Sequence, residues 1–309
     1  MKVTVVGAGN VGATTAQLIL GEGLADVYLV DVVEGLAAGK ALDLAQAAPV
    51  LGHSGRVEGG TDYGPAAGSD LVVVTAGIAR KPGMSRDDLL KINGGIMVEV
   101  AKSIWQQCPD AVVIVVSNPL DVTTHIFHEA SGFPTSRVTG MAGVLDTARF
   151  RTFIAREIGC SPEDVNAMVL GGHGDSMVPL TSQASVSGVP VTRFLSDDAL
   201  ARIVKRTQDG GAEIVGLLKT GSAFYAPAAA VCQMVSAVLR DEQRILPVCA
   251  YVSGQYGLRN LFVGVPAKLG QRGVEEIVEV PLSDGELAAL RRSADHVRLA
   301  IEIWNAMKP

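Results

Sequence analysis

The spacing of apolar and polar positions changes several times along the N-terminal half of the chain between that of a strand and that of a helix. These changes predict alternating strands and helices. Residues 2–6 form a short run rich in β-branched side chains, and residues 13–20 carry apolar positions at helical spacing. A second apolar run at 27–30 again has the length of a strand. Strands that alternate with helices in this way are typical of a parallel sheet with helices on both faces.

The alternation continues to about residue 139. We predict helices at 36–47 and 87–107 and strands at 56–59, 71–75, 111–116 and 138–139. The helix at 36–47 is rich in small residues, which makes it a candidate subunit interface, although ordinary packing on the sheet explains it equally well. We therefore predict a doubly wound Rossmann sheet for residues 1–143.

The pattern after residue 143 is different and predicts an α+β domain with an antiparallel sheet over residues 144–309. Helices are predicted at 145–158, at 196–219 with a break near Gly210 and Gly211, and at 224–239; strands are predicted at 165–170, 245–252, 261–265 and 276–280. Ser283 and Glu286, three residues apart, predict a capping box for a last helix that runs to about residue 307.

The turn after the first strand reads GAGNVG at residues 7–12. Gly7 allows a sharp turn, Gly9 lets backbone N–H groups approach a pyrophosphate, and Gly12 lets the helix pack close to the strand. Asp31 stands nineteen positions after Gly12, where an acid accepts hydrogen bonds from an adenosine ribose. A carboxylate repels a 2′-phosphate, so the pattern favours NAD over NADP. A glycine turn that serves only packing is the alternative.

Composition adds constraints on partners. The chain has 309 residues, of which 48% are hydrophobic and 19% charged, and its mean hydropathy is +0.30. The length suits two packed domains or one large α/β unit. The small charged fraction leaves apolar surface exposed, so we expect self-association. The formal net charge of −6 argues against nucleic-acid and anionic-membrane partners, so local arginines must hold any anionic substrate.

The cysteines and the start of the chain suggest a compartment. The four cysteines are far apart in sequence and show no paired spacing that suits a metal or redox motif. We expect reduced thiols and no metal. Because residue 2 already begins a predicted strand, we expect no signal peptide, and no apolar run is long enough to span a membrane. These features predict a cytoplasmic protein with no membrane partner.

Two predicted strands end in residues suited to ligand binding, because a doubly wound sheet binds ligands beyond the carboxyl ends of its strands. One strand ends at Ala76 and Gly77, and the loop that follows carries three cations, among them Arg80 and Arg86. The segment 78–90 could act as a mobile lid whose cations face a ligand. The alternative is that the three cations simply lie on a solvent-exposed surface.

The next predicted strand ends at Ser117, Asn118 and Pro119, at the same edge of the sheet. Asn118 offers both a donor and an acceptor near the nicotinamide half of a dinucleotide. A plain turn before the helix that Pro119 opens is the alternative.

A candidate acid–base pair follows in the second half. Asp146 and Arg149 are three residues apart on a predicted helix and share a face, which by itself suggests a surface ion pair. His173 lies in the sequence GGHGD at 171–175 rather than on an apolar face. With Asp146 as its partner, the imidazole would have a fixed tautomer and a favoured protonated form. A turn histidine without a chemical role is the alternative.

These motifs, in this order, closely resemble the lactate/malate dehydrogenase family over essentially the whole chain. Within the family the chain is most similar to the lactate-dehydrogenase-like malate dehydrogenases of bacteria. The resemblance implies that His173 and Asp146 are the proton-transfer pair and that Arg149 binds the C1 carboxylate of the substrate. It also implies that Arg86 polarises the reacting carbonyl.

The resemblance extends to the cofactor pocket. Asn118 is implied to contact both substrate and cofactor, with a cis peptide bond to Pro119, and Ser222 matches the wall of the pocket. The candidate NAD-binding residues are Gly7, Gly9, Asn10, Val11, Gly12, Asp31, Ala76, Gly77, Asn93, Ser117 and Asn118.

Arg80 decides the substrate that the resemblance implies. Lactate dehydrogenases carry glutamine at this position, which suits the methyl group of pyruvate. Oxaloacetate has a second carboxylate, and a buried anion needs a cationic partner. We therefore predict an NAD-dependent enzyme that interconverts (S)-malate and oxaloacetate, assembled as a homodimer or homotetramer. A lactate dehydrogenase and a non-catalytic NAD-binding protein on the same fold are the alternatives.

Overall fold

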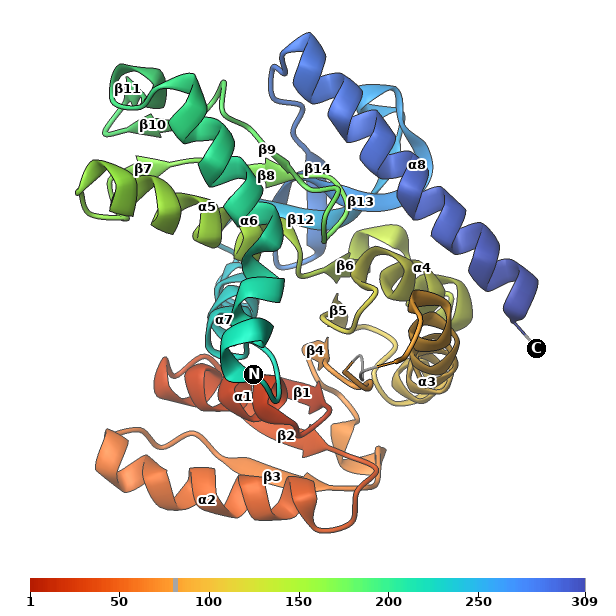
Figure 1. The fold of residues 1–309 in the computed structure, drawn as a ribbon. Coiled ribbons are helices and arrows are strands. Elements are labelled where there is room, and N and C mark those ends of the chain that lie inside the picture. The colour runs from red at the N-terminus through yellow and green to blue at the C-terminus, as the bar shows by residue number, and fades with distance from the viewer. Residues whose placement is uncertain (80–82, 309) are drawn as a thin grey trace.

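The computed structural model describes residues 1–79 and 83–308. Figure 1 shows a central sheet flanked by helices, with the N-terminal strands and the C-terminal hairpin at its two ends. The described strands form a nine-stranded sheet in the order β14-β13-β12-β6-β5-β4-β1-β2-β3. Strands β1 to β6 are parallel to one another, which confirms the predicted doubly wound sheet.

The N-terminal elements follow the predicted alternation. They are β1 (Lys2–Val6), α1 (Asn10–Gly21), β2 (Asp26–Val30), α2 (Leu36–Leu51), β3 (Val57–Gly60), β4 (Leu71–Val74), α3 (Arg86–Gln107), β5 (Val112–Val115), α4 (Leu120–Ser131) and β6 (Val138–Gly140). Successive side chains of the central strands enter two cores on opposite faces: Val73 packs with residues of α1 and α7, and Val72 with residues of α3 and α4. Burial on both faces explains why these strands are continuous apolar runs.

The C-terminal half adds a hairpin to the same sheet. Its elements are α5 (Gly143–Ile158), β7 (Val165–Asn166), β8 (Val169–Leu170), β9 (Val178–Pro179), β10 (Ser185–Val186), β11 (Val189–Pro190), α6 (Asp197–Leu218), α7 (Tyr225–Leu239), β12 (Arg244–Ser253), β13 (Arg259–Gly270), β14 (Gly273–Ile277) and α8 (Asp284–Met307). β12, β13 and β14 are antiparallel, as predicted, and Cys249 of β12 pairs with Gly140 of β6. The two halves therefore share one sheet. The capping box of Ser283 and Glu286 is present at the start of α8.

Several predicted boundaries were wrong. The helix predicted at 36–47 extends to Leu51, and the strand predicted at 261–265 spans Arg259–Gly270. The strand predicted at 165–170 is two strands in different sheets, because β7 pairs with β10 and β8 pairs with β9. The break predicted near Gly210 is absent from α6, because the two glycines there leave room for a side chain from α5. The strand predicted at 276–280 spans Gly273–Ile277 instead, because the hairpin turn after β13 lets pairing begin at Gly273, opposite Gly270.

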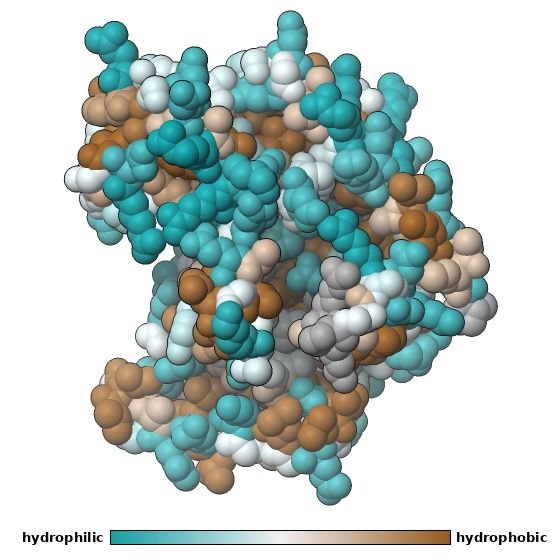
Figure 2. Space-filling model, in the orientation of Figure 1, coloured by the Kyte–Doolittle hydropathy of each residue, from teal (hydrophilic) through white to brown (hydrophobic). Residues whose placement is uncertain are grey.

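Large apolar side chains are exposed on α2 and at the end of α6. They are Leu42, Val50 and Leu51 on the former and Val215, Leu217 and Leu218 on the latter. Figure 2 shows apolar patches over the part of the molecule that α2 and the neighbouring strands form. The proposal that α2 takes part in a subunit interface is compatible with this surface.

Gly94 and Gly95 of α3 allow a matched test of how α8 packs. A Cβ at Gly94 would lie 2.4 Å from the ring of Trp304, whereas a Cβ at Gly95 would meet no heavy atom within 4 Å. We expect Gly94→Ala to lower the free energy of unfolding by about 1–3 kcal/mol, because the buried ring cannot yield. Gly95→Ala should raise it by up to about 1 kcal/mol. Urea denaturation measures both, and equal midpoints would contradict this packing.

Candidate functional site

The glycine turn after β1 has the close contacts that the sequence predicted. A Cβ at Gly12 would lie 1.9 Å from the carbonyl oxygen of Gly7, so α1 can approach β1 only if residue 12 is glycine. Gly7 itself has a φ of +101°, and its Cβ would lie 2.6 Å from Oγ1 of Thr75. Both glycines are therefore required by the protein's own packing.

Gly9 differs from these two, because a Cβ there would meet no heavy atom within 4 Å. It is the N-cap of α1 and provides no side-chain cap, and the first turn of the helix contains no acid. The N–H groups and the positive end of the helix dipole are thus available to an anion. A dinucleotide pyrophosphate fits these residues, and its close approach would explain a glycine that protein packing does not need.

Asp31 is held beside this turn at the end of β2. Its Oδ2 accepts a hydrogen bond from the backbone N–H of Ala8 at 2.7 Å, and its Oδ1 accepts one from Val33 at 3.0 Å. An ionised carboxylate has further acceptor sites, which ribose hydroxyls could use. Val32 and Val33 are 90% and 56% exposed and contribute no positive charge, which suits NAD better than NADP.

The turns after β4 and β5 are tied together by Asn93 of α3. Its buried Oδ1 accepts from the N–H of Ile78 at 2.9 Å, and its Nδ2 donates to the carbonyl oxygens of Ile78 at 3.1 Å and Asn118 at 2.7 Å. A Cβ at Gly77 would crowd this amide at 3.1 Å. Asn93 thus supports the backbone of two candidate residues, and its own contact with the cofactor stays a prediction.

The neighbouring candidates follow the same edge of the sheet. The hydroxyl of Ser117 donates to the carbonyl oxygen of Ala76, which joins the ends of β4 and β5. The side chain of Asn118 is exposed, and the Asn118-Pro119 peptide bond is cis, as predicted. Asn10 is exposed and Val11 half-buried at the start of α1. The carboxyl edge of the parallel strands therefore carries all of these candidates.

The loop that carries His173 is held by backbone hydrogen bonds to three separate elements. The N–H of Gly171 donates to the carbonyl oxygen of Gly264 on β13 at 2.8 Å. The next N–H donates to Oγ of Ser293 on α8 at 2.8 Å, and the N–H of His173 donates to Oδ2 of Asp121 on α4 at 2.8 Å. These bonds fix the position of the imidazole relative to the sheet.

His173, Asp146 and Arg149 lie together, as the sequence suggested. Nδ1 of His173 lies 2.7 Å from Oδ2 of Asp146, and Nη1 of Arg149 lies 2.9 Å from Oδ1 of the same carboxylate. The side chains of the histidine and the arginine are each 14% exposed, and that of the aspartate 2%. The alternative that these residues form a surface ion pair is therefore wrong.

The surroundings of His173 favour its protonated form. Burial opposes a charged imidazole, but the attraction and hydrogen bond of Asp146 outweigh this effect, so the pKa of His173 is raised from its usual value. Because Asp146 occupies Nδ1, Nε2 is the nitrogen left for proton exchange with a ligand. The arrangement is that of an oriented acid–base group.

Arg149 has capacity for a further partner. Its Nε is buried and has no hydrogen-bond partner among the residues that the structure describes. A ligand carboxylate could satisfy it with the fork geometry that guanidinium groups offer. A Cβ at Gly210 of α6 would lie 3.1 Å from Cδ of Arg149, which explains the glycine that was expected to break the helix.

The remaining candidates are placed less fully. Nη2 of Arg86 lies 2.7 Å from Oδ2 of Asp175, and both side chains are well exposed, so the start of α3 meets the histidine loop. Ser222 is exposed in the segment between α6 and α7, and its place in the pocket stays a prediction. Arg80 lies outside the described residues, as do residues 81 and 82 of the predicted lid at 78–90.

Asp121 and Ser293 support the histidine loop and were not anticipated from the sequence. An acid in the first turn of a helix after Pro119 is adequately explained by the helix dipole. A serine within a long amphipathic helix offers no signal at all. Only the tertiary structure brings the two residues to the loop.

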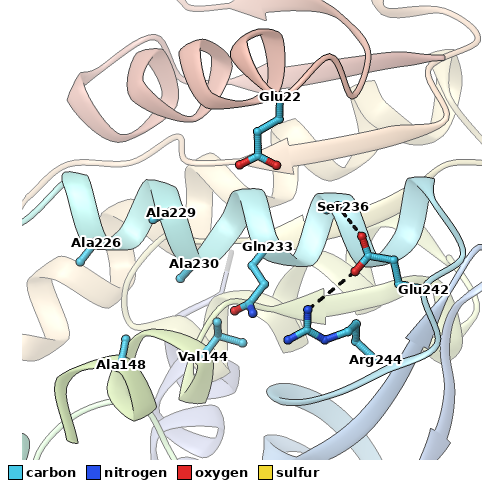
Figure 3. Close-up of a pocket in the computed structure, with 10 residues that line it drawn as sticks. All are labelled: Glu22, Val144, Ala148, Ala226, Ala229, Ala230, Gln233, Ser236, Glu242 and Arg244. Carbon is cyan, nitrogen blue, oxygen red and sulfur yellow. Dashed lines mark hydrogen bonds and ion pairs between the residues drawn. The ribbon is translucent and has the colours of Figure 1, made fainter. Parts of the chain in front are cut away.

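A separate cavity of about 380 Å³ is lined by residues of α5, α7 and β12. Figure 3 shows its lining residues, among them Glu22, Val144, Ala148, Glu242 and Arg244, none of which is a candidate site residue. Val144 and Ala148 belong to the helix that carries Asp146, but Figure 3 shows them directed into this cavity. The cavity is thus distinct from the site around His173.

The described part of the chain shows neither a metal cluster nor a membrane-spanning helix. No group of three or more His, Cys, Asp and Glu residues there is arranged to hold a metal ion. Within the same residues, no helix is both long and apolar enough to cross a membrane.

The chain matches two family models. The lactate/malate dehydrogenase NAD-binding domain matches residues 1–140, and the α/β C-terminal domain of lactate/malate dehydrogenase matches residues 143–307. The chain belongs to the lactate/malate dehydrogenase family. Residues 1–140 are its NAD-binding domain, so NAD is the cofactor that the glycine turn and Asp31 fit.

Individual members of the family are similar over the full length. A malate dehydrogenase of Thermomicrobium roseum is 57% identical, over 99% of this chain and 98% of that protein. The structure of malate dehydrogenase from Salinibacter ruber has a TM-score of 0.96 and 49% identity, covering 100% of this chain and 99% of that one. A lactate dehydrogenase from Cryptosporidium parvum, complexed with lactic acid and the cofactor, has a TM-score of 0.96 at 41% identity and covers 98% of both chains.

Gly9→Ala tests whether this glycine serves the cofactor rather than the fold. A methyl group there meets no protein atom, so we expect the melting temperature to change by less than about 2 °C. The affinity for NADH should fall by about tenfold or more, because the methyl group occupies the approach to the helix N-terminus. NADH fluorescence titration measures this change. Gly12→Ala is the contrasting variant, since it should destabilise the fold itself. An unaltered NADH affinity in Gly9→Ala would refute the assignment.

Proposed function

We propose that the protein is an NAD-dependent malate dehydrogenase, which transfers hydride reversibly between (S)-malate and NAD to give oxaloacetate and NADH. The observation that carries the proposal is the buried cluster in which Asp146 holds both His173 and Arg149. The high identity to proteins named malate dehydrogenase supports the choice of substrate. NAD, when bound, accepts or supplies the hydride.

His173 moves the proton of the reaction. In malate oxidation, neutral His173 accepts the proton of the C2 hydroxyl at Nε2, and in oxaloacetate reduction the imidazolium returns it. Asp146 keeps the ring in one tautomer and stabilises the imidazolium. The raised pKa of His173 keeps the proton donor available for reduction towards higher pH.

The arginines bind the anionic groups of the substrate. Arg149 takes the C1 carboxylate through the part of its guanidinium that Asp146 leaves free. Arg86 polarises the C2 carbonyl, and its exposed pair with Asp175 is weak enough to be exchanged for substrate. Arg80 binds the second carboxylate. Asn118 completes the contacts to substrate and cofactor, and Ser222 contributes to the pocket wall.

We also propose three features of the whole molecule. The chain divides into an NAD-binding domain at 1–143 and a substrate-binding domain at 144–309, supported by family matches that meet near this boundary. It assembles as a homodimer or homotetramer, supported by the exposed apolar side chains of α2 and α6. It is cytoplasmic, supported by four free cysteines.

Lactate dehydrogenase is the second candidate, because a lactate dehydrogenase shares the fold at 41% identity. A steady-state assay of NADH oxidation with oxaloacetate, pyruvate and longer 2-oxo acids separates the two. A preference for oxaloacetate supports the proposal, and a preference for pyruvate favours the second candidate. Failure to turn over any 2-oxo acid would leave a non-catalytic NAD-binding protein and refute both.

His173→Ala removes the proton donor without touching the glycine turn. We expect kcat to fall by about 10³-fold or more, since general acid–base catalysis contributes about 10²–10⁴-fold and the ring also orients the substrate. The affinity for NADH should stay within about twofold. Stopped-flow turnover and fluorescence titration measure the two quantities. A variant that keeps its kcat would defeat the assignment.

Arg80→Gln tests the basis of substrate choice. The variant should lose kcat/KM for oxaloacetate and gain it for pyruvate, with a change in their ratio of up to about 10⁴, because an unpaired polar group in the pocket is costly. Lys81→Gln is the matched control, since it removes the adjacent cation, and its ratio should stay near that of the wild type. If both variants change the ratio equally, general charge and not Arg80 determines preference.

A further inference from the structure

Asp121 is a buried acid that the mechanism above does not use. It lies in the first turn of α4 and is only 5% exposed. Its Oδ2 accepts the backbone N–H of His173 at 2.8 Å, and the thiol of Cys249 also interacts with the carboxylate. Its Oδ1 is buried and has no nitrogen or oxygen donor among the described residues. A carboxylate in such a place is costly unless a positive group compensates it.

The described neighbours of Asp121 offer almost no positive charge. Cys249 of β12 lies against it as a neutral thiol, because burial and the nearby carboxylate raise the pKa of that thiol well above its usual value. Ser293 of α8 and Ser176 of the histidine loop form a neutral hydroxyl pair at 3.0 Å. Among these described neighbours of Asp121, the imidazole of His173 is the group that can become a cation.

The charges around His173 come from three elements. Asp146 of α5 and Asp121 of α4 favour its protonation, and Arg149 of α5 opposes it. Asp175 forms an exposed, solvent-screened pair with Arg86 of α3. The pKa of Asp121 is raised on balance, because the effect of burial exceeds the opposing effects of the bond and charge of His173 and of the Cys249 thiol. The two groups therefore favour each other's charged forms.

We propose that Asp121 is a positioning residue that acts on His173 in two ways. Its Oδ2 fixes the backbone of the histidine loop, and its negative charge provides a second carboxylate that stabilises the imidazolium alongside Asp146. The inference rests on the proposed role of His173 as proton carrier. It assigns the histidine a pair of carboxylates, one hydrogen-bonded to its ring and one to its backbone.

Asp121→Asn separates charge from geometry. The amide has the same size, and its oxygen can still accept the N–H of His173, but the negative charge is gone. Removing a charge that favours the imidazolium must lower the pKa of His173. The midpoint of the His173 resonance in an NMR titration of [¹³Cε1]histidine-labelled protein should therefore move to lower pH. The protein has five histidines, and a His173→Gln variant assigns the signal.

The same shift has opposite effects on the two directions of the reaction. Reduction needs the imidazolium, so kcat/KM for oxaloacetate on its alkaline limb should fall by about threefold or more. Oxidation needs neutral His173, so kcat/KM for malate on its acid limb should rise by a similar factor. A loop that is merely loosened would lower both rates at every pH.

Ser293→Ala is the matched control, because it removes the neighbouring acceptor of the loop without changing any charge. Its His173 midpoint should equal that of the wild type. The proposal is overturned if folded Asp121→Asn keeps the wild-type midpoint, or if both variants shift it equally. If Asp121→Asn does not fold, Asp121→Ser, which also lacks the charge, takes its place. The NMR titration needs no substrate and can therefore be interpreted independently of activity. A wild-type protein that is inactive on oxaloacetate would refute the proposed function without affecting the titration result.

Discussion

One buried carboxylate organises the chemical part of this molecule. Asp146 is almost completely enclosed, and an ionised carboxylate in that position needs partners. It has two, the imidazole of His173 and the guanidinium of Arg149, one on each oxygen. The groups that we propose as proton carrier and as anion-binding group are thus held at fixed positions by a single acid. If either partner is lost, a buried charge is left under-compensated.

The sheet determines where this cluster lies relative to the glycine turn. β12 pairs antiparallel with β6 and so extends the same sheet. β13, which anchors the histidine loop at Gly264, and β1, which leads into the glycine turn, therefore belong to one hydrogen-bonded structure. α4 and α8 contribute the other two anchors, at Asp121 and Ser293. Residues far apart in sequence are therefore placed by regular elements and not by long loops, which gives the site the precision that proximity catalysis requires.

The sequence was most informative where structure depends on neighbouring residues. The glycine turn, the capping box of Ser283 and the alternation of strands and helices are local patterns, and the structure confirmed them. It was least informative where a distant contact decides the outcome. Gly210 suggested a helix break because its contact with Arg149 is invisible in sequence. Asp121 was missed for the same reason, since its role depends on a loop about fifty residues away.

The two described arginines of the site differ in burial, and this difference explains how a dianion could be both bound and released. Arg149 is enclosed and permanently paired with Asp146, so its orientation is set before substrate arrives. Arg86 is 74% exposed, and its partner Asp175 is 81% exposed, so solvent screens their attraction and the pair can open at little cost. In the proposed mechanism the fixed Arg149 would orient one carboxylate, while the exchangeable Arg86 would meet the carbonyl only when substrate is present. Binding energy is then directed to the reacting atoms, where it lowers the barrier.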